Sequence, residues 1–143
     1  MGIEAAMGSS VNFHVEGVPA PKGSKIRTRF GMRESSQRVK PWEDLVTQAA
    51  AIAADAECLL GPLTPPYRVD VWFYIAKPRT TRATHPVAPT VGDGDKLLRS
   101  TFDALKTGGL ILDDRFIVAG EWSKEWAVGE KPGAIIRITE VTA

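Results

Sequence analysis

Cysteine and histidine are almost missing from this sequence of 143 residues, which contains one cysteine and two histidines. A single thiol excludes an internal disulfide and a cysteine-based zinc cluster. His14 and His85 are far apart and have no partner at metal-ligand spacing. We therefore expect metal-binding or catalytic chemistry to come from other side chains. We expect Cys58 to be a small buried apolar residue near the end of a helix.

Long hydrophobic runs are also absent. The longest uninterrupted apolar stretches, residues 49–54 and 71–76, are far shorter than the roughly 20 residues that a membrane helix needs. Residues 1–10 lack the basic start and apolar core of a secretory signal, and we expect them to form a flexible lead-in. The remaining composition is that of a folded chain, with 43% hydrophobic and 24% charged residues. We therefore expect a single domain over residues 11–143, in a cytoplasmic protein without membrane contact.

The net charge of +1 conceals an uneven distribution of charge. Residues 22–40 contain seven lysines and arginines but one acid, Glu34. A second basic cluster, formed by Lys77, Arg79 and Arg82, lies in a stretch without acids. Such a distribution can hold a polyanion on one face while acidic residues act elsewhere.

Hydrophobic periodicity predicts both strands and helices. Alternating apolar residues predict strands over residues 11–17, 26–32, 67–77, 115–128 and 134–141. The second of these strands can form a hairpin with the first. A first helix is expected to open at Pro41 and to end at the LLGPLTPP segment, residues 59–66. Its expected apolar face consists of Leu45, Val46, Ala49, Ile52 and Ala53.

A second amphipathic helix is expected from about Asp95 to Lys106, followed by a stop at Gly108 and Gly109. We expect its inward residues to be Leu97, Leu98, Thr101, Phe102 and Leu105, and its outward residues to be Lys96, Arg99, Ser100 and Asp103. Residues 78–89 are expected to form a mobile loop before it. This order of elements predicts an α+β fold, a two-layer domain with helices packed on one face of a mixed β-sheet.

Acidic residues flank the second helix on both sides. Asp93 and Asp95 precede it, and Asp113 and Asp114 follow it. Each has an ordinary explanation, because Asp95 can cap the helix and pair with Arg99, Asp93 can interact with the helix dipole, and the later acids can form a turn. These explanations account for each residue separately.

The alternative is that the acids act together. In an extended chain Asp93 and Asp95 point the same way, and the helix followed by a strand is expected to return Asp113 and Asp114 to them. Converging carboxylates repel one another unless a cation neutralises them. Hard oxygen ligands suit Mg²⁺ or Mn²⁺, which can activate water for attack at phosphorus. Arg99, one turn beyond Asp95, would then offset negative charge on the phosphate.

The segment GDGDKLLRSTFDALKTGGLILDD, residues 92–114, resembles the RusA-like family of Holliday junction resolvases, most of which are encoded by bacteriophages and prophages. The family signature is D-x-D-N, a basic residue on the following helix, DAL, a glycine break and a final Asp-Asp. The segment GVPAPKGSKIRTR, residues 17–29, is similar to the family's N-terminal region. The resemblance implies a RusA-like fold and a homodimeric, Mg²⁺-dependent endonuclease, with Mn²⁺ as a possible substitute. Such an enzyme resolves four-way DNA junctions by two symmetric nicks, in DNA recombination and repair.

The resemblance also implies site residues. The family's metal-binding acids fall on Asp93, Asp95 and Asp114, with Asp113 as their neighbour, and its helix lysine falls on Arg99. Because a guanidinium is a poor proton donor, we assign Arg99 electrostatic stabilisation as its catalytic role. Lys96 stands where the family has Asn. The candidates for contacts with DNA phosphates are Lys22, Lys25, Arg27, Arg29, Lys77, Arg79, Lys96 and Lys124.

Trp122 and Trp126 lie on either side of Lys124 at strand spacing. We expect them to pack in the core or in a dimer interface, with base stacking as the alternative. For the whole chain, one alternative function is a module that binds branched DNA without cutting it, with the acids as caps. Another is an interaction protein whose basic segment binds an acidic partner.

Overall fold

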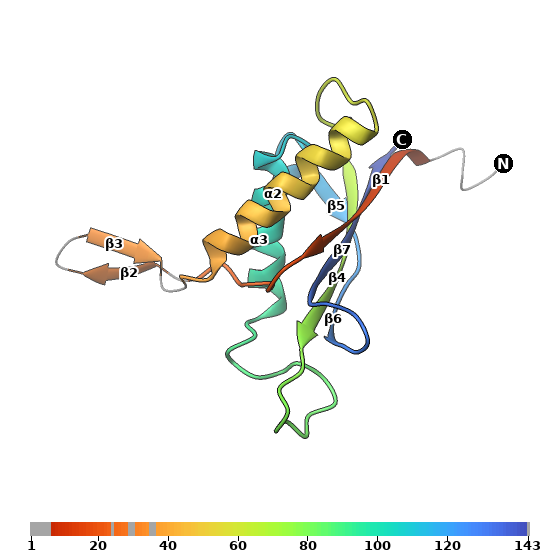
Figure 1. Ribbon diagram of the computed structural model, residues 1–143. Helices are drawn as coiled ribbons and strands as arrows, with labels where there is room; N and C mark the ends of the chain where they lie inside the picture. Colours follow the sequence, from red (N-terminus) through yellow and green to blue (C-terminus); the bar gives the residue numbers. More distant parts are fainter. Residues whose placement is uncertain (1–6, 24, 29–30, 35–36, 143) are drawn as a thin grey trace.

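The computed structural model describes residues 7–23, 25–28, 31–34 and 37–142, and its two long helices cover one face of a mixed β-sheet (Figure 1). The helices are α2 (Val39–Ala56) and α3 (Gly94–Thr107). The sheet consists of β1 (Met7–Glu16), β4 (Tyr67–Ala76), β5 (Ile117–Ala119), β6 (Trp122–Ala127) and β7 (Gly133–Val141). This confirms the expected α+β class with helices on one face of a mixed sheet.

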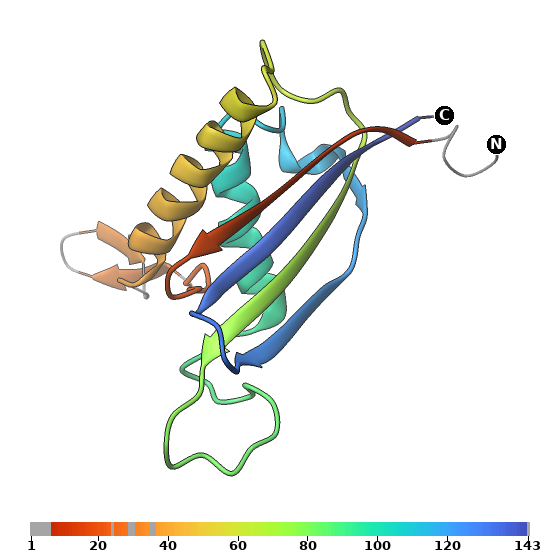
Figure 2. The same ribbon diagram turned by 45° about the vertical axis from the view of Figure 1, so that its right-hand side comes forward.

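Strand β4 lies at the centre of the sheet, as the alternation of residues 67–77 predicts. It pairs antiparallel with β7, which pairs antiparallel with β1, and it pairs parallel with β5 and β6 (Figure 2). Val69, Val71 and Phe73 point from β4 into the core and are buried. The strand expected over residues 115–128 is divided into β5 and β6 at Gly120, where an added Cβ would lie 1.8 Å from the Val69 carbonyl oxygen.

The expected hairpin between the first two strands is wrong. Strand β1 begins at Met7 and pairs with β7 alone among the described strands. Strand β2 (Lys25–Thr28) instead forms a separate hairpin with β3 (Gly31–Glu34). The connection from β1 contains two prolines, Pro19 and Pro21, which cannot donate backbone hydrogen bonds to a sheet. The hairpin therefore projects from the end of the domain where α3 begins (Figures 1 and 2).

Helix α2 begins at Val39, slightly before the expected start at Pro41, and its buried face is rotated from the expected one. Trp42, Val46 and Ala53 are buried, whereas Leu45 is 38% exposed and Ile52 is 70% exposed. This buried face packs against α3, where the Trp42 Nε1 donates a hydrogen bond to Thr101 Oγ1 at 3.2 Å.

Helix α3 ends at the predicted glycines, with Gly108 as C-cap and Gly109 at a φ of +84°. Its Leu97, Thr101 and Leu105 are buried as expected, and Leu98 and Phe102 are half-buried. The outward placement of Ser100 is wrong, because its hydroxyl is buried and donates to the Ala20 carbonyl at 2.7 Å. Among the described residues, neither helix has the length and apolar character required to cross a membrane.

Cys58 follows the C-terminus of α2, at a φ of +56°. The expectation that its thiol is buried is wrong, since the residue is exposed. The apolar face of α2 ends before Cys58, so the turn carries this side chain away from the core.

Asp70 is a buried carboxylate on β4 that the sequence pattern did not single out. It is 0% exposed. Its oxygens lie 3.0 Å from Arg68 Nη2 and 3.0 Å from Arg137 Nη2, and one accepts the Glu121 N–H at 2.9 Å. Burial alone would raise the pKa of Asp70, but the hydrogen bonds from Arg68, Glu121 and Arg137 outweigh it and lower the pKa below its ordinary value. Asp70 therefore links β4 to β7 and to the start of β6. Its negative charge is compensated by the two arginines and the backbone N–H.

Replacing Asp70 with Asn is expected to lower the free energy of unfolding at pH 7 by about 2 kcal/mol, because the arginines lose their charged acceptor. The folded pKa of Asp70 is depressed, so its stabilisation is complete above the unfolded pKa of about 3.9 and is lost as the pH falls through the folded value. Urea unfolding between pH 7 and pH 2 should show the gap between wild type and variant closing in acid. A gap that stays constant, or an equal loss in Asp55→Asn on the exposed side of α2, would contradict this role.

Candidate functional site

Asp93 and Asp95, called here the N-terminal acid pair, lie at the start of α3. Asp93 is the N-cap residue, in place of the expected Asp95, and Asp95 lies in the first turn. Both residues are exposed. Among the described residues, neither carboxylate has a hydrogen-bond or ion-pair partner, and the expected Asp95–Arg99 pair does not form. The positive end of the helix dipole favours negative charge at this position. The N-terminal acid pair is therefore open to a ligand from solvent.

Asp113 and Asp114, called here the C-terminal acid pair, begin the short helix η1 (Asp114–Phe116) after α3. Asp113 caps η1 by accepting the Arg115 N–H at 3.4 Å, and it lies 3.7 Å from Lys106 Nζ. A hydrogen bond with Asp113 is the first cause that raises the pKa of Asp114, followed by burial and by the charges of Asp113 and Asp103. The same hydrogen bond, with that from the Arg115 N–H, lowers the pKa of Asp113. The C-terminal acid pair thus shares negative charge that its neighbours do not fully neutralise.

The two acid pairs lie at opposite ends of α3 within one copy of the chain. Asp114 interacts with Asp103 and Lys106 in the last turns of the helix. The 14 residues of α3, at a rise of about 1.5 Å each, separate this end from Asp95 by more than three turns. The described residues contain no group of three or more His, Cys, Asp or Glu side chains that could hold a metal ion. The return of the chain along β5 and β6 begins only after Asp114, so the expected convergence does not occur within one copy.

An apolar groove runs between the two acid pairs, along the side of α3 that faces β5 and β6. Its volume is about 160 Å³, and it is lined chiefly by Leu98, Phe102, Ile117, Ala119 and Trp122. Trp122, which is 47% exposed, contacts Gly94 beside the N-terminal acid pair. Ile117, at the other end, directly follows η1 and the C-terminal acid pair. Val118, beside the groove, is 62% exposed. The acid pairs are therefore joined by a partly exposed apolar surface.

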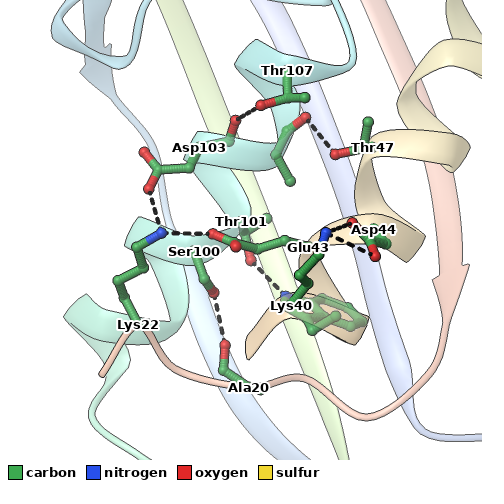
Figure 3. A network of polar contacts seen from close by, with 12 residues as sticks. Ala20, Lys22, Lys40, Glu43, Asp44, Thr47, Ser100, Thr101, Asp103 and Thr107 are labelled. Atoms are coloured by element: carbon green, nitrogen blue, oxygen red, sulfur yellow. Dashed lines mark hydrogen bonds and ion pairs between the residues drawn. The ribbon is translucent and has the colours of Figure 1, made fainter. Parts of the chain in front are cut away.

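Lys22, a candidate contact for DNA phosphates, has protein partners. Its Nζ lies 3.0 Å from Glu43 of α2 and 3.3 Å from Asp103 of α3 (Figure 3). Its backbone N–H donates to the Lys96 carbonyl at 3.0 Å. Burial alone would lower the pKa of the Lys22 ammonium, but both carboxylates raise it above its ordinary value. Lys22 therefore ties the segment before β2 to both helices, and a phosphate would have to compete with these acids.

The other candidate DNA contacts are distributed over several elements. Lys25 and Arg27 belong to β2, although their side chains lie outside the described part of the structure, as does Arg29 altogether. Lys77 and Arg79 are exposed just after β4, Arg99 is exposed on α3, and Lys96 is half-buried in its first turn. Both the β2–β3 hairpin and the loop after β4 project from the end of the domain where α3 begins (Figures 1 and 2). Basic segments therefore lie near the N-terminal acid pair.

Lys124 and the two tryptophans of β6 contact the loop that leads into α3. Lys124 Nζ donates to the Gly92 carbonyl at 3.1 Å, and Trp126 Nε1 donates to the Ala83 carbonyl at 3.0 Å. Trp122 lies outside the core, which leaves the dimer interface as its expected packing site, and Trp126 is half-buried. The alternation of Trp122, Lys124 and Trp126 in the sequence indicates that they share a strand face, but it does not identify the loop that they contact.

Replacing Asp114 with Asn is expected to raise the melting temperature at pH 7, because it removes a charge that its acidic neighbours disfavour. Since the folded pKa of Asp114 is raised, the wild type is relatively stable in acid and loses stability as the pH rises through that pKa. The gain in melting temperature should therefore vanish below about pH 4. Thermal unfolding followed by circular dichroism between pH 3 and pH 8 measures this effect. A lower melting temperature at pH 7, or a gain that persists in acid, would contradict it.

A comparison with protein families gives one match that covers most of the chain. The family model described as endodeoxyribonuclease RusA matches residues 16–139. The matched range includes both acid pairs, both long helices and the whole of β4, β5 and β6. This confirms the resemblance drawn from residues 17–29 and 92–114. Among curated proteins, no sequence matches the chain.

Proposed function

We propose, from the premise that this chain belongs to the RusA endodeoxyribonuclease family, that it is a divalent-metal-dependent nuclease that resolves four-way DNA junctions by paired symmetric nicks. The family match makes an endodeoxyribonuclease the expected activity. The observation that carries the finer proposal is the placement of two acid pairs, neither of them fully neutralised by its neighbours, at the ends of one helix, with basic segments near one of them. Recombination and repair in the cytoplasm of a bacterial host, from a phage or prophage gene, is the proposed setting.

Asp93, Asp95 and Asp114 would hold Mg²⁺, for which Mn²⁺ can substitute, with Asp113 beside them. Their chemistry fits such an ion, because exposed carboxylates are hard oxygen donors. The raised pKa of Asp114 also indicates uncompensated negative charge that a cation would relieve. When bound, the ion supplies activation of water and neutralisation of charge at the phosphate. Arg99, exposed one turn beyond Asp95, adds a fixed positive charge for the same phosphate.

A homodimer would bring the separated acid pairs together. In a two-fold dimer each contact is made twice, with the roles of the subunits exchanged. If two copies cover the groove between α3 and β6, the N-terminal acid pair of each copy can meet the C-terminal acid pair of the other. The exposed apolar residues along that groove, Trp122 and Val118, favour burial against a partner. Two equivalent sites related by a two-fold axis suit two symmetric nicks.

The basic residues would bind the arms of the junction. The β2–β3 hairpin, with Lys25, Arg27 and Arg29 in or beside it, and the loop with Lys77 and Arg79 would contact phosphates on either side of the N-terminal acid pair. Lys96 would contact a phosphate close to the cut. Because these contacts are to the DNA backbone, affinity is expected to depend on branched shape and on salt more than on sequence.

The alternative is a module that binds branched DNA without cutting it. It is favoured by the capping position of Asp93 and the capping hydrogen bond of Asp113, which give both residues a role without metal. A labelled four-way junction incubated with Mg²⁺ or with EDTA, beside linear duplex competitor, distinguishes the two on a denaturing gel. Binding without a metal-dependent product would favour the module, and loss of all salt-sensitive DNA binding would favour an interaction protein.

Asp95→Asn is expected to lower the rate of Mg²⁺-dependent junction cleavage by on the order of 100-fold or more, since it removes a charged metal ligand. Junction affinity in EDTA should be unchanged or higher, because one negative charge near the DNA is lost. Single-turnover cleavage and gel-shift titration measure the two effects, with the exposed Asp55→Asn on α2 as the matched control. Cleavage by the Asp95→Asn variant at the wild-type rate would rule out this assignment.

Mixing two inactive variants tests whether the site is shared between subunits. A heterodimer of Asp95→Asn and Asp114→Asn would contain one site with both changes and one site with neither. Subunit exchange in an equal mixture should therefore restore nicking of one strand at up to about a quarter of the wild-type rate, because about half of the dimers are heterodimers and each has one intact site of two. If all three acids of a site came from one chain, each site would carry one change and mixing would restore nothing.

A further inference from the structure

We infer that strand β6 is a template that sets the geometry of the loop carrying the N-terminal acid pair, with Lys124 and Trp122 as positioning residues. The inference rests on the proposed function, because it concerns how Asp93 and Asp95 are held ready for a metal. It gives Lys124 a different role from the phosphate contact suggested by its charge.

Lys124 holds the loop through a backbone carbonyl one residue before Asp93. Its half-buried ammonium donates to the Gly92 oxygen at 3.1 Å. Lys124 pairs with Phe73 in the register between β6 and β4, and Phe73 points into the core. Paired residues on neighbouring strands point to the same face, so Lys124 points to the helix side of the sheet. Its donor is therefore directed at the start of α3 rather than at the opposite face of the sheet.

Trp122 restricts the position of the loop by steric contact with its indole ring. A Cβ on Gly94 would lie 2.0 Å from Cη2 of the Trp122 indole, and 2.5 and 2.6 Å from two further ring atoms. A glycine between Asp93 and Asp95 is thus required by the close approach of the ring, although glycine is otherwise a poor residue at the start of a helix. The ring fixes the distance between β6 and the first turn of α3.

Two further contacts fix the same loop at other points. A Cβ on Gly92, which has a φ of +99°, would lie 2.4 Å from Cγ of Pro21, so the loop is closed on its other side by the segment before β2. Trp126 holds the loop earlier in the chain, at the Ala83 carbonyl. The N-terminal acid pair is therefore attached to a rigid strand on one side and to a proline on the other. Carboxylates fixed in this way lose less conformational entropy when they bind a cation.

Lys124→Met tests the hydrogen bond, and Lys131→Met is the matched control because Lys131 is exposed and pairs with Glu16 only at 3.8 Å. In metal-free protein, the hydrogen-bonded amides of Val91, Lys96 and Leu97 should exchange with solvent about 10-fold faster in Lys124→Met than in the control. The Mg²⁺ concentration for half-maximal cleavage should rise about 10-fold, as for other residues that orient metal ligands. Junction affinity in EDTA should match that of the control variant. Unchanged exchange and metal dependence with weaker, less salt-sensitive junction binding would make Lys124 a phosphate contact and overturn the inference.

Gly94→Ala tests the contact with Trp122, and Gly61→Ala is its control because a Cβ on Gly61 has open space. Gly94→Ala should speed exchange of the same hydrogen-bonded amides and raise the required Mg²⁺ concentration, whereas Gly61→Ala should do neither. Adding Trp122→Leu shortens the side chain but keeps it apolar, so the double variant should recover part of the loss. Wild-type behaviour of Gly94→Ala, or no recovery in the double variant, would show that the ring does not set the loop.

Failure of the inference differs from failure of the proposed function. If wild-type protein shows no metal-dependent cleavage of a junction, the proposed nuclease is wrong, whatever the exchange data show. If wild type cleaves, but neither Lys124→Met nor Gly94→Ala changes amide exchange or the Mg²⁺ concentration required for cleavage, the proposed nuclease activity is supported. The inferred role of β6 is then wrong.

Discussion

The packing of α3 against both α2 and the sheet is the constraint on which the arrangement of the acids depends (Figure 2). Leu97, Thr101 and Leu105 are buried on one face of the helix, and the Trp42 indole is hydrogen-bonded to Thr101 within that contact. Since the N-terminal acid pair begins this helix and the C-terminal acid pair follows it, the position of α3 determines where all four carboxylates lie. Polar contacts from Ser100 and Asp103 then attach the segment before β2, and with it the basic hairpin, to the same helix (Figure 3).

Asp70 and Asp114 are carboxylates in opposite electrostatic environments. Asp70 is buried, but two arginines and a backbone N–H compensate its charge and lower its pKa. Asp114 has acidic neighbours, and its pKa is raised. The first arrangement stabilises the fold, whereas the second costs stability unless a positive charge arrives. Such unfavourable charge is typical of sites built to bind a cation or to perform chemistry. On this account the C-terminal acid pair is maintained for function, and Asp70 for structure.

Local patterns predicted the elements well, and spatial relations between them poorly. Alternation identified β4, and glycines marked the end of α3, because these signals are set by neighbouring residues. The buried face of α2 was predicted wrongly, since it depends on a distant group, Thr101. The hairpin partner of β2 was also predicted wrongly, because Pro19 and Pro21 interrupt the chain after β1 and β2 pairs instead with the next segment, β3. The acid-bearing segment pointed to the family, which the match over residues 16–139 confirmed. However, the sequence could not show that the chain returns along β5 and β6 only after Asp114, or that Gly94 is required by Trp122.

The central claim is that acids from opposite ends of α3, supplied by two copies of the chain, hold one divalent cation. A crystal structure of the protein with Mn²⁺ tests it most directly, because the anomalous signal of the metal locates the ion independently of the protein atoms. The account predicts a peak bounded by Asp93 and Asp95 of one copy and by Asp114 of its two-fold mate, repeated at the second site. A Mn²⁺ peak held by the acids of a single chain, or one at the C-terminal acid pair with none near Asp93, would contradict it.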